Sequence, residues 1–274
     1  MEAEACKPVM DPDSADPTCL LLREDRDGVT TLSLNRPNQA NALSEELMGA
    51  LQAALDAAGA EPSVRVVVIA AVGRAFSAGH DLKQMRAHPE RGYYEALFAR
   101  CRRLMLTLRE IPQPVIAKVQ WLATAAGCQL VASCDLAVAA SDARFATSGI
   151  NVGLFCATPA VPLSRDVSRK RAFEMLMTGE FIDAQTARDW GLVNRVVPAH
   201  QLDAEVAALA REITSKSRVA VETGKRMFHR QLEMTLDEAT AYAAEVMARN
   251  MLAEDAGEGI DAFLERRAPV WKGR

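Results

Sequence analysis

Aromatic residues are scarce in this sequence. They make up 5% of the 274 residues, so the core has to be built mainly from Ala, Val, Leu and Met. Long apolar runs are also missing, and the longest, residues 66–72, is far too short to cross a membrane as a helix. The first residues are acidic and lack the apolar stretch of a secretory signal, and they do not resemble a mitochondrial presequence. We therefore expect a disordered acidic tail over residues 1–18, a cytoplasmic location and no membrane partner.

A strong excess of either charge is absent as well. The net charge is −4, which gives no electrostatic reason to expect nucleic acid or an anionic membrane as a partner. Two basic stretches, residues 100–109 and 224–230, place their cations at helical spacing opposite apolar residues. This pattern is typical of a solvated amphipathic face. No nucleic-acid partner is therefore expected.

Cysteine is present, but not in a metal-binding pattern. None of the six cysteines belongs to a CxxC pair, and no His lies at metal-ligand spacing from any of them. In a chain of this length we predict free thiols in a reducing compartment. No metal site is expected.

The patterns that are present alternate between strand and helix. A hairpin is expected over residues 19–34, a buried strand over 64–72, and further strands over 115–119 and 136–140, with helices between them. From residue 168 onward the pattern is mainly helical, with three helical segments between 200 and 267. This order predicts an α/β core over residues 19–198 and a helical C-terminal region over 199–274.

Five motifs follow one another along the chain. They are LNRPNQANAL (34–43), AFSAGHDLKQM (75–85), PVIAKVQWLATAAGCQLVASCDLAVAA (114–140), TGEFIDAQTARDWGLVNRVVP (178–198) and EGIDAFLERRAPVWKG (258–273). Each alone is a weak signal, but five in register are a strong one. Together they resemble the crotonase, or enoyl-CoA hydratase/isomerase, superfamily over nearly everything after residue 18.

The resemblance implies both an architecture and a chemistry. In the superfamily, repeated ββα units wrap into a spiral, and the C-terminal helices mediate trimers that often pair into hexamers. The ligands are acyl-CoA thioesters, with no separate cofactor, and the shared chemistry is stabilisation of a thioester enolate by two backbone N–H groups. We therefore expect an acyl-CoA ligand and a homotrimer or hexamer, with residues 199–274 as the oligomerisation region.

The same resemblance assigns the two N–H groups to His80 and Ala126. Ala126 also begins an expected helix, so the helix dipole adds positive potential there. Relatives usually carry two glycines where this chain has Ala125 and Ala126, and alanine is expected to fit if φ is negative, as at a helix start. Tight packing without chemistry is the alternative interpretation of this stretch. The His80 imidazole is expected to point to solvent, with a titrating role as its alternative.

Contacts to coenzyme A are carried over from the first two motifs. The matching positions are Arg36, Ala40, Ala78, Asp81, Leu82 and Lys83. Arg36 and Lys83 are candidates for the phosphates, with solvated surface charges as the alternative. Asp81 is expected to cap a helix, and the remaining histidines, His88, His200 and His229, are expected at the surface.

The two glutamates that hydratases of the superfamily use are replaced here. Gln129 and Gly149 occupy their positions, and glutamine has no proton to exchange in the useful range, while glycine is expected to leave only space. General acid–base catalysis contributes about 10²–10⁴-fold per group, so ordinary hydration is in doubt. Glu95 is a weaker acid candidate, more typical of a surface residue. The sequence thus predicts a hydratase-like acyl-CoA protein, with a non-catalytic acyl-CoA binder or sensor as the alternative.

Overall fold

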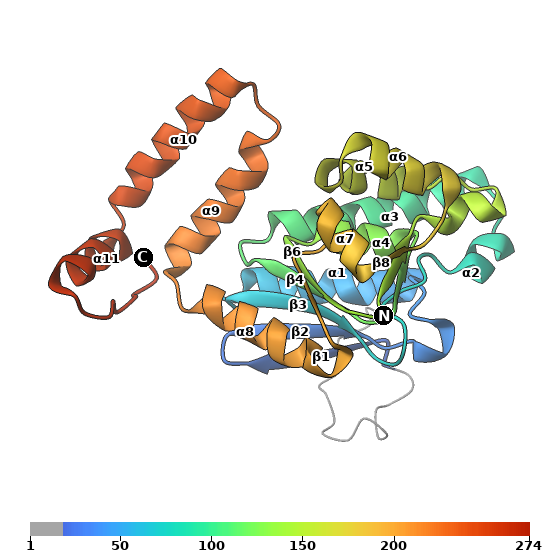
Figure 1. Cartoon of the computed structure of the whole chain (residues 1–274), viewed down its shortest axis with the longest axis horizontal. Coiled ribbons are helices and arrows are strands. Elements are labelled where there is room, and N and C mark those ends of the chain that lie inside the picture. Colours follow the sequence, from blue (N-terminus) through green and yellow to red (C-terminus); the bar gives the residue numbers. More distant parts are fainter. Residues whose placement is uncertain (1–18) are drawn as a thin grey trace.

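The computed structural model describes residues 19–274, so the predicted tail over residues 1–18 lies outside the described residues. Strands and most helices form one body, and the last three helices extend from it as an arm (Figure 1). The predicted α/β class is confirmed, with helices in the C-terminal part.

The larger sheet has the strand order β1-β2-β3-β4-β6-β9. Its strands are β1 (Leu21–Arg26), β2 (Val29–Leu34), β3 (Val66–Ala71), β4 (Val115–Val119), β6 (Leu136–Ala140) and β9 (Arg195–Val197). Strands β1 and β2 are antiparallel, and all later pairs are parallel. The predicted hairpin is confirmed: Asp27 and Gly28 form its turn with φ of 51° and 77°, as the two-residue hairpin turns require.

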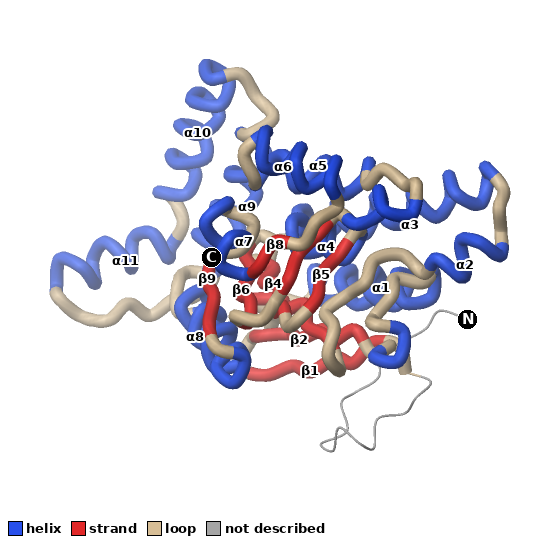
Figure 2. Tube along the Cα trace, turned by 45° about the vertical axis from the view of Figure 1, so that its right-hand side comes forward, coloured by secondary structure: helices blue, strands red, loops and turns tan. Residues whose placement is uncertain are grey.

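A smaller sheet stands against the first (Figure 2). It contains β5 (Leu122–Thr124), β7 (Arg144–Ala146) and β8 (Ile182–Asp183). Strand β5 follows β4 along the chain and leads directly into helix α4 (Ala126–Ser133), which gives one ββα unit of the expected spiral. The predicted start of that helix at Ala126 is confirmed.

Helices cover both faces of the larger sheet. On one face, Val67 and Ile69 of β3 pack against α1 (Glu45–Ala60), α3 (Arg91–Glu110) and α4. On the other face, Val66 and Val68 contact α8 (Leu202–Thr214) through Leu202, Val206, Leu209 and Ala210. Burial on both faces explains why β3 is apolar throughout instead of alternating.

The remaining helices complete the body and the arm. They are α2 (Leu82–Ala87), α5 (Ala157–Asp166), α6 (Arg169–Thr178), α7 (Ala184–Trp190), α9 (Arg218–Gln231), α10 (Leu236–Met251) and α11 (Glu254–Glu265), with 3₁₀ turns η2 (Pro37–Gln39), η3 (Ser148–Val152) and η4 (Ala199–Gln201). The prediction of three C-terminal segments is wrong, because α8, α9, α10 and α11 are four. Ser217 caps α9 and separates it from α8, a break that the continuous apolar periodicity conceals.

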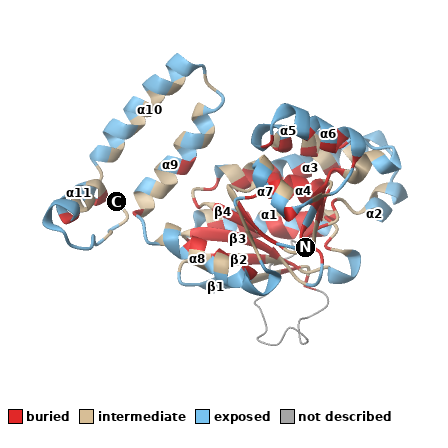
Figure 3. Ribbon diagram, in the orientation of Figure 1, coloured by how far each residue is buried: buried red, intermediate tan, exposed pale blue. Residues whose placement is uncertain are grey.

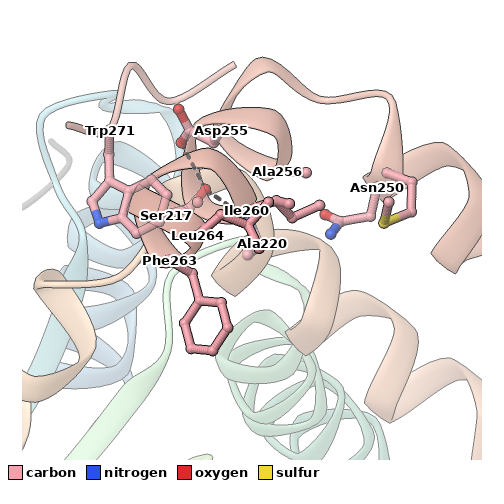
Figure 4. Close-up of a pocket in the computed structure, with 11 residues that line it drawn as sticks. Ser217, Ala220, Asn250, Asp255, Ala256, Ile260, Phe263, Leu264 and Trp271 are labelled. Carbon is pink, nitrogen blue, oxygen red and sulfur yellow. Dashed lines mark hydrogen bonds between the residues drawn. The ribbon is translucent and has the colours of Figure 1, made fainter. Parts of the chain in front are cut away.

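Most of the arm is exposed (Figure 3). Its exposed residues include the apolar Leu236, Leu252 and Phe263, each at 82% exposure or more. A groove of about 450 Å³ lies between α9, α11 and the C-terminal segment, lined by Phe263, Leu264 and Trp271 among others (Figure 4). Exposed apolar patches of this kind mark association surfaces. Because α8 packs on the sheet, the predicted boundary of the oligomerisation region at residue 199 stays a prediction.

A buried carboxylate holds the arm's C-terminal segment in place. Asp255 accepts hydrogen bonds from the Ser217 hydroxyl at 2.7 Å and from the backbone of Lys272 and Gly273. Burial on its own would raise the pKa of Asp255, but these hydrogen bonds outweigh it and the pKa is lowered.

Residues 19–274 contain no helix that could span a membrane and no cluster of metal-ligating side chains. The predicted free thiols are confirmed at Cys101, Cys128, Cys134 and Cys156. The prediction is wrong for Cys19, which is disulfide-bonded, and Cys6 lies outside the described residues.

Candidate active site

Backbone hydrogen bonds bring the first two motifs together. The Leu43 amide donates to the Gly79 carbonyl at 2.8 Å, and the Ala78 amide donates to the Ala40 carbonyl at 2.9 Å. The buried side chain of Asn41 donates to the carbonyls of Val72 and Ala75. The loops of residues 34–43 and 75–85 therefore form one rigid unit.

The third motif joins the same unit through Ser77. Its amide donates to the Leu122 carbonyl and its carbonyl accepts from the Thr124 amide, both at 3.0 Å. Strand β5 and the start of α4 are thereby placed beside the SAGHDL loop.

The amides of His80 and Ala126 come from these two adjacent segments. Gly79 has φ of 89°, and a Cβ atom at this position would lie 3.0 Å from the Ala126 nitrogen. Neither amide donates to a protein acceptor among residues 19–274. The first amides of a helix lack partners within the helix, and here one of them lies next to a second unused donor.

Ala125 departs from the expectation of a negative φ. Its φ is 51° and its ψ −121°, while Ala126 begins α4. The Ala125 amide donates to the Ala146 carbonyl, and the Ala125 carbonyl accepts from the Gln129 amide, so the turn is fixed from both sides. A non-glycine residue in such a conformation costs on the order of 1–3 kcal/mol, which the surrounding structure has to offset.

The His80 imidazole does not point to solvent, as was expected. It packs edge-on against Phe98 with 5.5 Å between ring centroids, and its Nε2 is buried without a hydrogen-bond partner among residues 19–274. Desolvation lowers the pKa of His80 from 6.5 to about 4. The ring is therefore neutral near pH 7 and does not titrate there.

The buried His80 ring should make stability depend on pH. Because the folded protein binds this proton less readily than the unfolded chain, stability is full above pH 6.5 and falls as the pH drops toward the folded value of about 4. We expect about 2 kcal/mol of unfolding free energy to be lost between pH 7 and pH 5. Urea unfolding at both pH values measures this, and His80→Gln should flatten the dependence. An equal loss in the variant would contradict the assignment.

Gln129 lies on α4 with only 5% of its surface exposed. Its Oε1 has no hydrogen-bond partner in the described part of the chain. The side chain lines a cavity of about 850 Å³ between α3, α4 and α5. Glu95 also lines this cavity, where it pairs with Arg91 at 2.7 Å.

The structure leaves no free space for a side chain at Gly149. A Cβ atom there would lie 2.6 Å from the Leu154 carbonyl oxygen and 2.8 Å from the Cys156 sulfur. The expectation of an empty position is wrong, because the chain turns back over Gly149 after η3, with the Leu154 amide bonded to the Gly149 carbonyl at 2.9 Å.

Gly149→Ala is expected to destabilise the fold by about 1–3 kcal/mol, since the added methyl group meets backbone rather than a flexible side chain. Gly49→Ala, on an exposed turn of α1 with open space around it, serves as the matched control and should be neutral or slightly stabilising. Thermal unfolding of both variants measures the difference. Equal melting temperatures would show that the loop over Gly149 yields freely.

Two of the six positions carried over for coenzyme A line a second cavity. Leu82 and Lys83 line this space of about 860 Å³, which shares Tyr94 and Phe98 with the first cavity. Asp81 caps α2, as predicted, by accepting from the amides of Lys83 and Gln84.

Arg36 is already engaged in this structure. Its guanidinium pairs with Asp81 at 3.0 Å and donates to the Ala42 carbonyl at 2.6 Å. This contact ties the first motif to α2. Of the two cations proposed for the phosphates, Lys83 is the one that lines the second cavity, together with Arg86.

Apart from Glu95, the residues of α3 that face the cavities are absent from the sequence prediction. Four of them, Tyr94, Phe98, Met105 and Arg109, follow one another at spacings of four or seven residues along one side of α3. The spacing of these residues is visible in the sequence, but it is that of any amphipathic helix. Only the structure shows that α5 lies opposite them across a cavity.

His229 is not the surface residue that was expected. Its Nε2 lies 2.6 Å from Asp135 Oδ1, and its Nδ1 faces the Arg109 guanidinium. Asp135 also pairs with the buried Lys225 at 2.7 Å. These contacts anchor α9 to the body of the protein.

Comparison with known proteins points to the family that the sequence motifs resemble. The enoyl-CoA hydratase/isomerase family matches residues 24–274. Human enoyl-CoA hydratase domain-containing protein 3, mitochondrial, is 46% identical over 245 residues, 89% of this chain and 81% of the human one. The zebrafish (Danio rerio) protein of that name is 43% identical over 258 residues, 94% and 89% of the two chains.

Solved structures show the same relationship. The crystal structure of an enoyl-CoA hydratase from Mycobacterium smegmatis has a TM-score of 0.91 and 58% identity, covering 92% of this chain and 98% of that one. The crystal structure of human enoyl-CoA hydratase domain-containing protein 3 has a TM-score of 0.90 and 44% identity, with coverage of 92% and 100%. The sequence motifs also resemble those of the domain-containing protein 3 branch, and these identities confirm that resemblance. The chain belongs to the enoyl-CoA hydratase/isomerase family and has its fold.

Proposed function

We propose that this protein binds acyl-CoA thioesters and stabilises the enolate form of the thioester with the backbone amides of His80 and Ala126. The observation that carries the proposal is the pairing, on adjacent segments, of two amides that have no acceptor among residues 19–274. The His80 ring packs on Phe98, which lines both cavities. A thioester oxygen that gains negative charge accepts both hydrogen bonds more strongly than the neutral oxygen does. Stabilisation is thus concentrated where charge develops.

The acid–base step of ordinary hydration lacks a proton-exchanging side chain at the two positions that the superfamily uses for it. Gln129 orients water but neither accepts nor releases a proton near pH 7. Gly149 has no side chain, and its surroundings leave no room for one. We therefore infer an enoyl-CoA hydratase-like protein whose hydration of enoyl thioesters is slow.

The second candidate function is a non-catalytic acyl-CoA binder or sensor. Gln129 favours it, because a buried amide oxygen without a partner is suited to receive a hydrogen bond from a bound ligand or water rather than to exchange a proton. The two candidates share the ligand and differ only in turnover.

One experiment tests both. The purified protein is titrated with short and medium saturated acyl-CoA esters by calorimetry, and trans-2-enoyl-CoA esters are then incubated with it while water addition is followed. Binding with slow hydration supports the enzyme, and binding without hydration supports the sensor. A rate near that of a hydratase with both glutamates would overturn the inference from Gln129 and Gly149. Absence of binding would overturn the proposal as a whole.

We also propose that the protein is a homotrimer or a hexamer, supported by the exposed apolar side chains of α9, α10 and α11. A cytoplasmic location is kept as a proposal, although the names of the vertebrate relatives place those proteins in mitochondria. Analytical ultracentrifugation and cell fractionation test these two points.

A further inference from the structure

The cavity that contains Gln129 has an unusual combination of walls. Its middle is apolar, built from Phe98, Ala99, Met105, Leu106, Val161 and Pro162. Its charged residues are four arginines, Arg91, Arg102, Arg109 and Arg165, and a single acid, Glu95. An apolar passage with an excess of guanidinium groups suits a ligand that has methylene groups in the middle and an anion at its end.

The arginines differ in how far they are already paired. Arg91 is bound to Glu95 at 2.7 Å, and Arg165 lies 3.9 Å from Glu233 with both side chains more than half exposed. Arg109 is half-buried, and among residues 19–274 it donates to no carboxylate. Asp166 is exposed and does not line the cavity. It interacts with Arg109 through its charge, but the two side chains form no ion pair.

A chain of contacts holds the Arg109 guanidinium in place. It lies 3.3–3.4 Å from Nδ1 of His229. Because arginine only donates, Nδ1 must accept, which places the ring hydrogen on Nε2, where Asp135 accepts it at 2.6 Å. Asp135 is itself fixed by the Val115 amide and by Lys225, each at 2.7 Å. The guanidinium is thus held in a fixed position, and its one acceptor among residues 19–274 is the Nδ1 nitrogen of the neutral His229 ring.

Arg109 stands at the far end of the cavity from the two amides. The His80 ring packs on Phe98, so the amide end lies at Phe98, and Arg109 is eleven residues further along α3, a rise of about 16 Å. Side chains lean toward the start of a helix, which brings the guanidinium back toward Met105 and shortens the span. A medium-length acyl chain fits this separation.

We propose that the cavity takes acyl thioesters whose far end carries a carboxylate, and that Arg109 is the residue that determines this specificity. The inference rests on the proposed acyl-CoA function and names its substrate class. The thioester oxygen lies at the two amides, the methylene groups pass the apolar wall, and the distal carboxylate makes a two-pronged contact with the Arg109 guanidinium.

Matched pairs of saturated thioesters test the proposal without requiring turnover. The full chain is titrated with hexanoyl-CoA and adipyl-CoA, and with octanoyl-CoA and suberyl-CoA, and the ratio of Kd values within each pair is the readout. Since a hydrogen-bonded charge pair gives about a ten- to hundredfold change in affinity, the dicarboxylic member should bind more tightly by that factor. Equal affinities would overturn the specificity while leaving the acyl-CoA function standing. Absence of binding by every thioester would overturn the function itself.

Variants assign the effect to one residue. Arg109→Met keeps length and apolar contact, and should abolish the preference while leaving the affinity for hexanoyl-CoA nearly unchanged. Arg102→Met, two turns earlier on the same side of α3, is the matched control and should leave the ratio as in the wild type. If the Arg102 variant, rather than the Arg109 variant, loses the difference in Kd within each pair, the assignment to Arg109 is overturned.

If Arg109→Met fails to fold, Arg109→Lys serves as the second variant. It should retain part of the preference, because the charge remains while the planar two-pronged donor is lost. An undiminished ratio in that variant would contradict the two-pronged contact.

Discussion

Replacing Ala126 with proline is expected to remove one of the two donors that we propose for the thioester oxygen. Proline has no N–H but is well accommodated at the first position of a helix, and Ala126 is the first residue of α4. Loss of one such donor lowers kcat about 10²–10³-fold in other enzymes, and we expect a similar factor for whatever turnover of enoyl-CoA the wild type has. The absorption band of a bound conjugated dienoyl-CoA, which shifts to longer wavelength when charge is drawn onto the carbonyl oxygen, should lose most of its shift.

Two further variants separate the missing donor from a damaged fold. Ala126→Gly keeps the N–H and should retain the wild-type shift. Leu236→Pro introduces proline at the first position of α10, on the exposed arm, and should leave both readouts unchanged. Circular dichroism checks that α4 still forms in the Ala126 variant. A folded Ala126→Pro protein with an undiminished spectral shift would remove Ala126 from the proposed site.

The features that the sequence predicts correctly are those set by neighbouring residues. The hairpin within residues 19–34, the cap at Asp81 and the start of α4 at Ala126 all depend on a few adjacent side chains. The motifs that point to His80 and Ala126 lie on segments that the fold does bring together, through Ser77 and Gly79. Whether those two amides bind a thioester is a matter for the experiments above.

The features that the sequence does not predict depend on contacts between distant parts of the chain. The positive φ of Ala125 is set by a bond to Ala146, and the crowding at Gly149 comes from Leu154 and Cys156. The buried contact of His229 requires α9 to lie against α3 and the turn that carries Asp135. Local periodicity carries no information about contacts between distant segments. The sequence therefore predicts a surface position for His229 and empty space beside Gly149.

Restoring one glutamate should restore hydration in part. Gln129→Glu keeps the shape of the side chain and adds a carboxyl group where Oε1 is now buried with no hydrogen-bond partner in the described part of the chain. Burial raises the pKa of a carboxyl group placed there toward neutrality, where it both accepts and donates a proton. We expect water addition to trans-2-enoyl-CoA to rise about 10²-fold, the lower end of the range for one general acid or base, in a stopped or continuous spectrophotometric assay.

The second glutamate should not add to this gain. Gly149→Glu meets the Leu154 carbonyl at its Cβ atom, so the double variant is expected to be less stable and no faster than Gln129→Glu alone. Gln129→Met, of similar length but without proton chemistry, is the control for altered cavity shape and should show no gain. If Gln129→Glu binds acyl-CoA normally yet hydrates no faster, the cavity places no water within reach of residue 129, and the binder or sensor becomes the better account. If the wild type is already as fast, hydration in this protein proceeds without a carboxylate at that position.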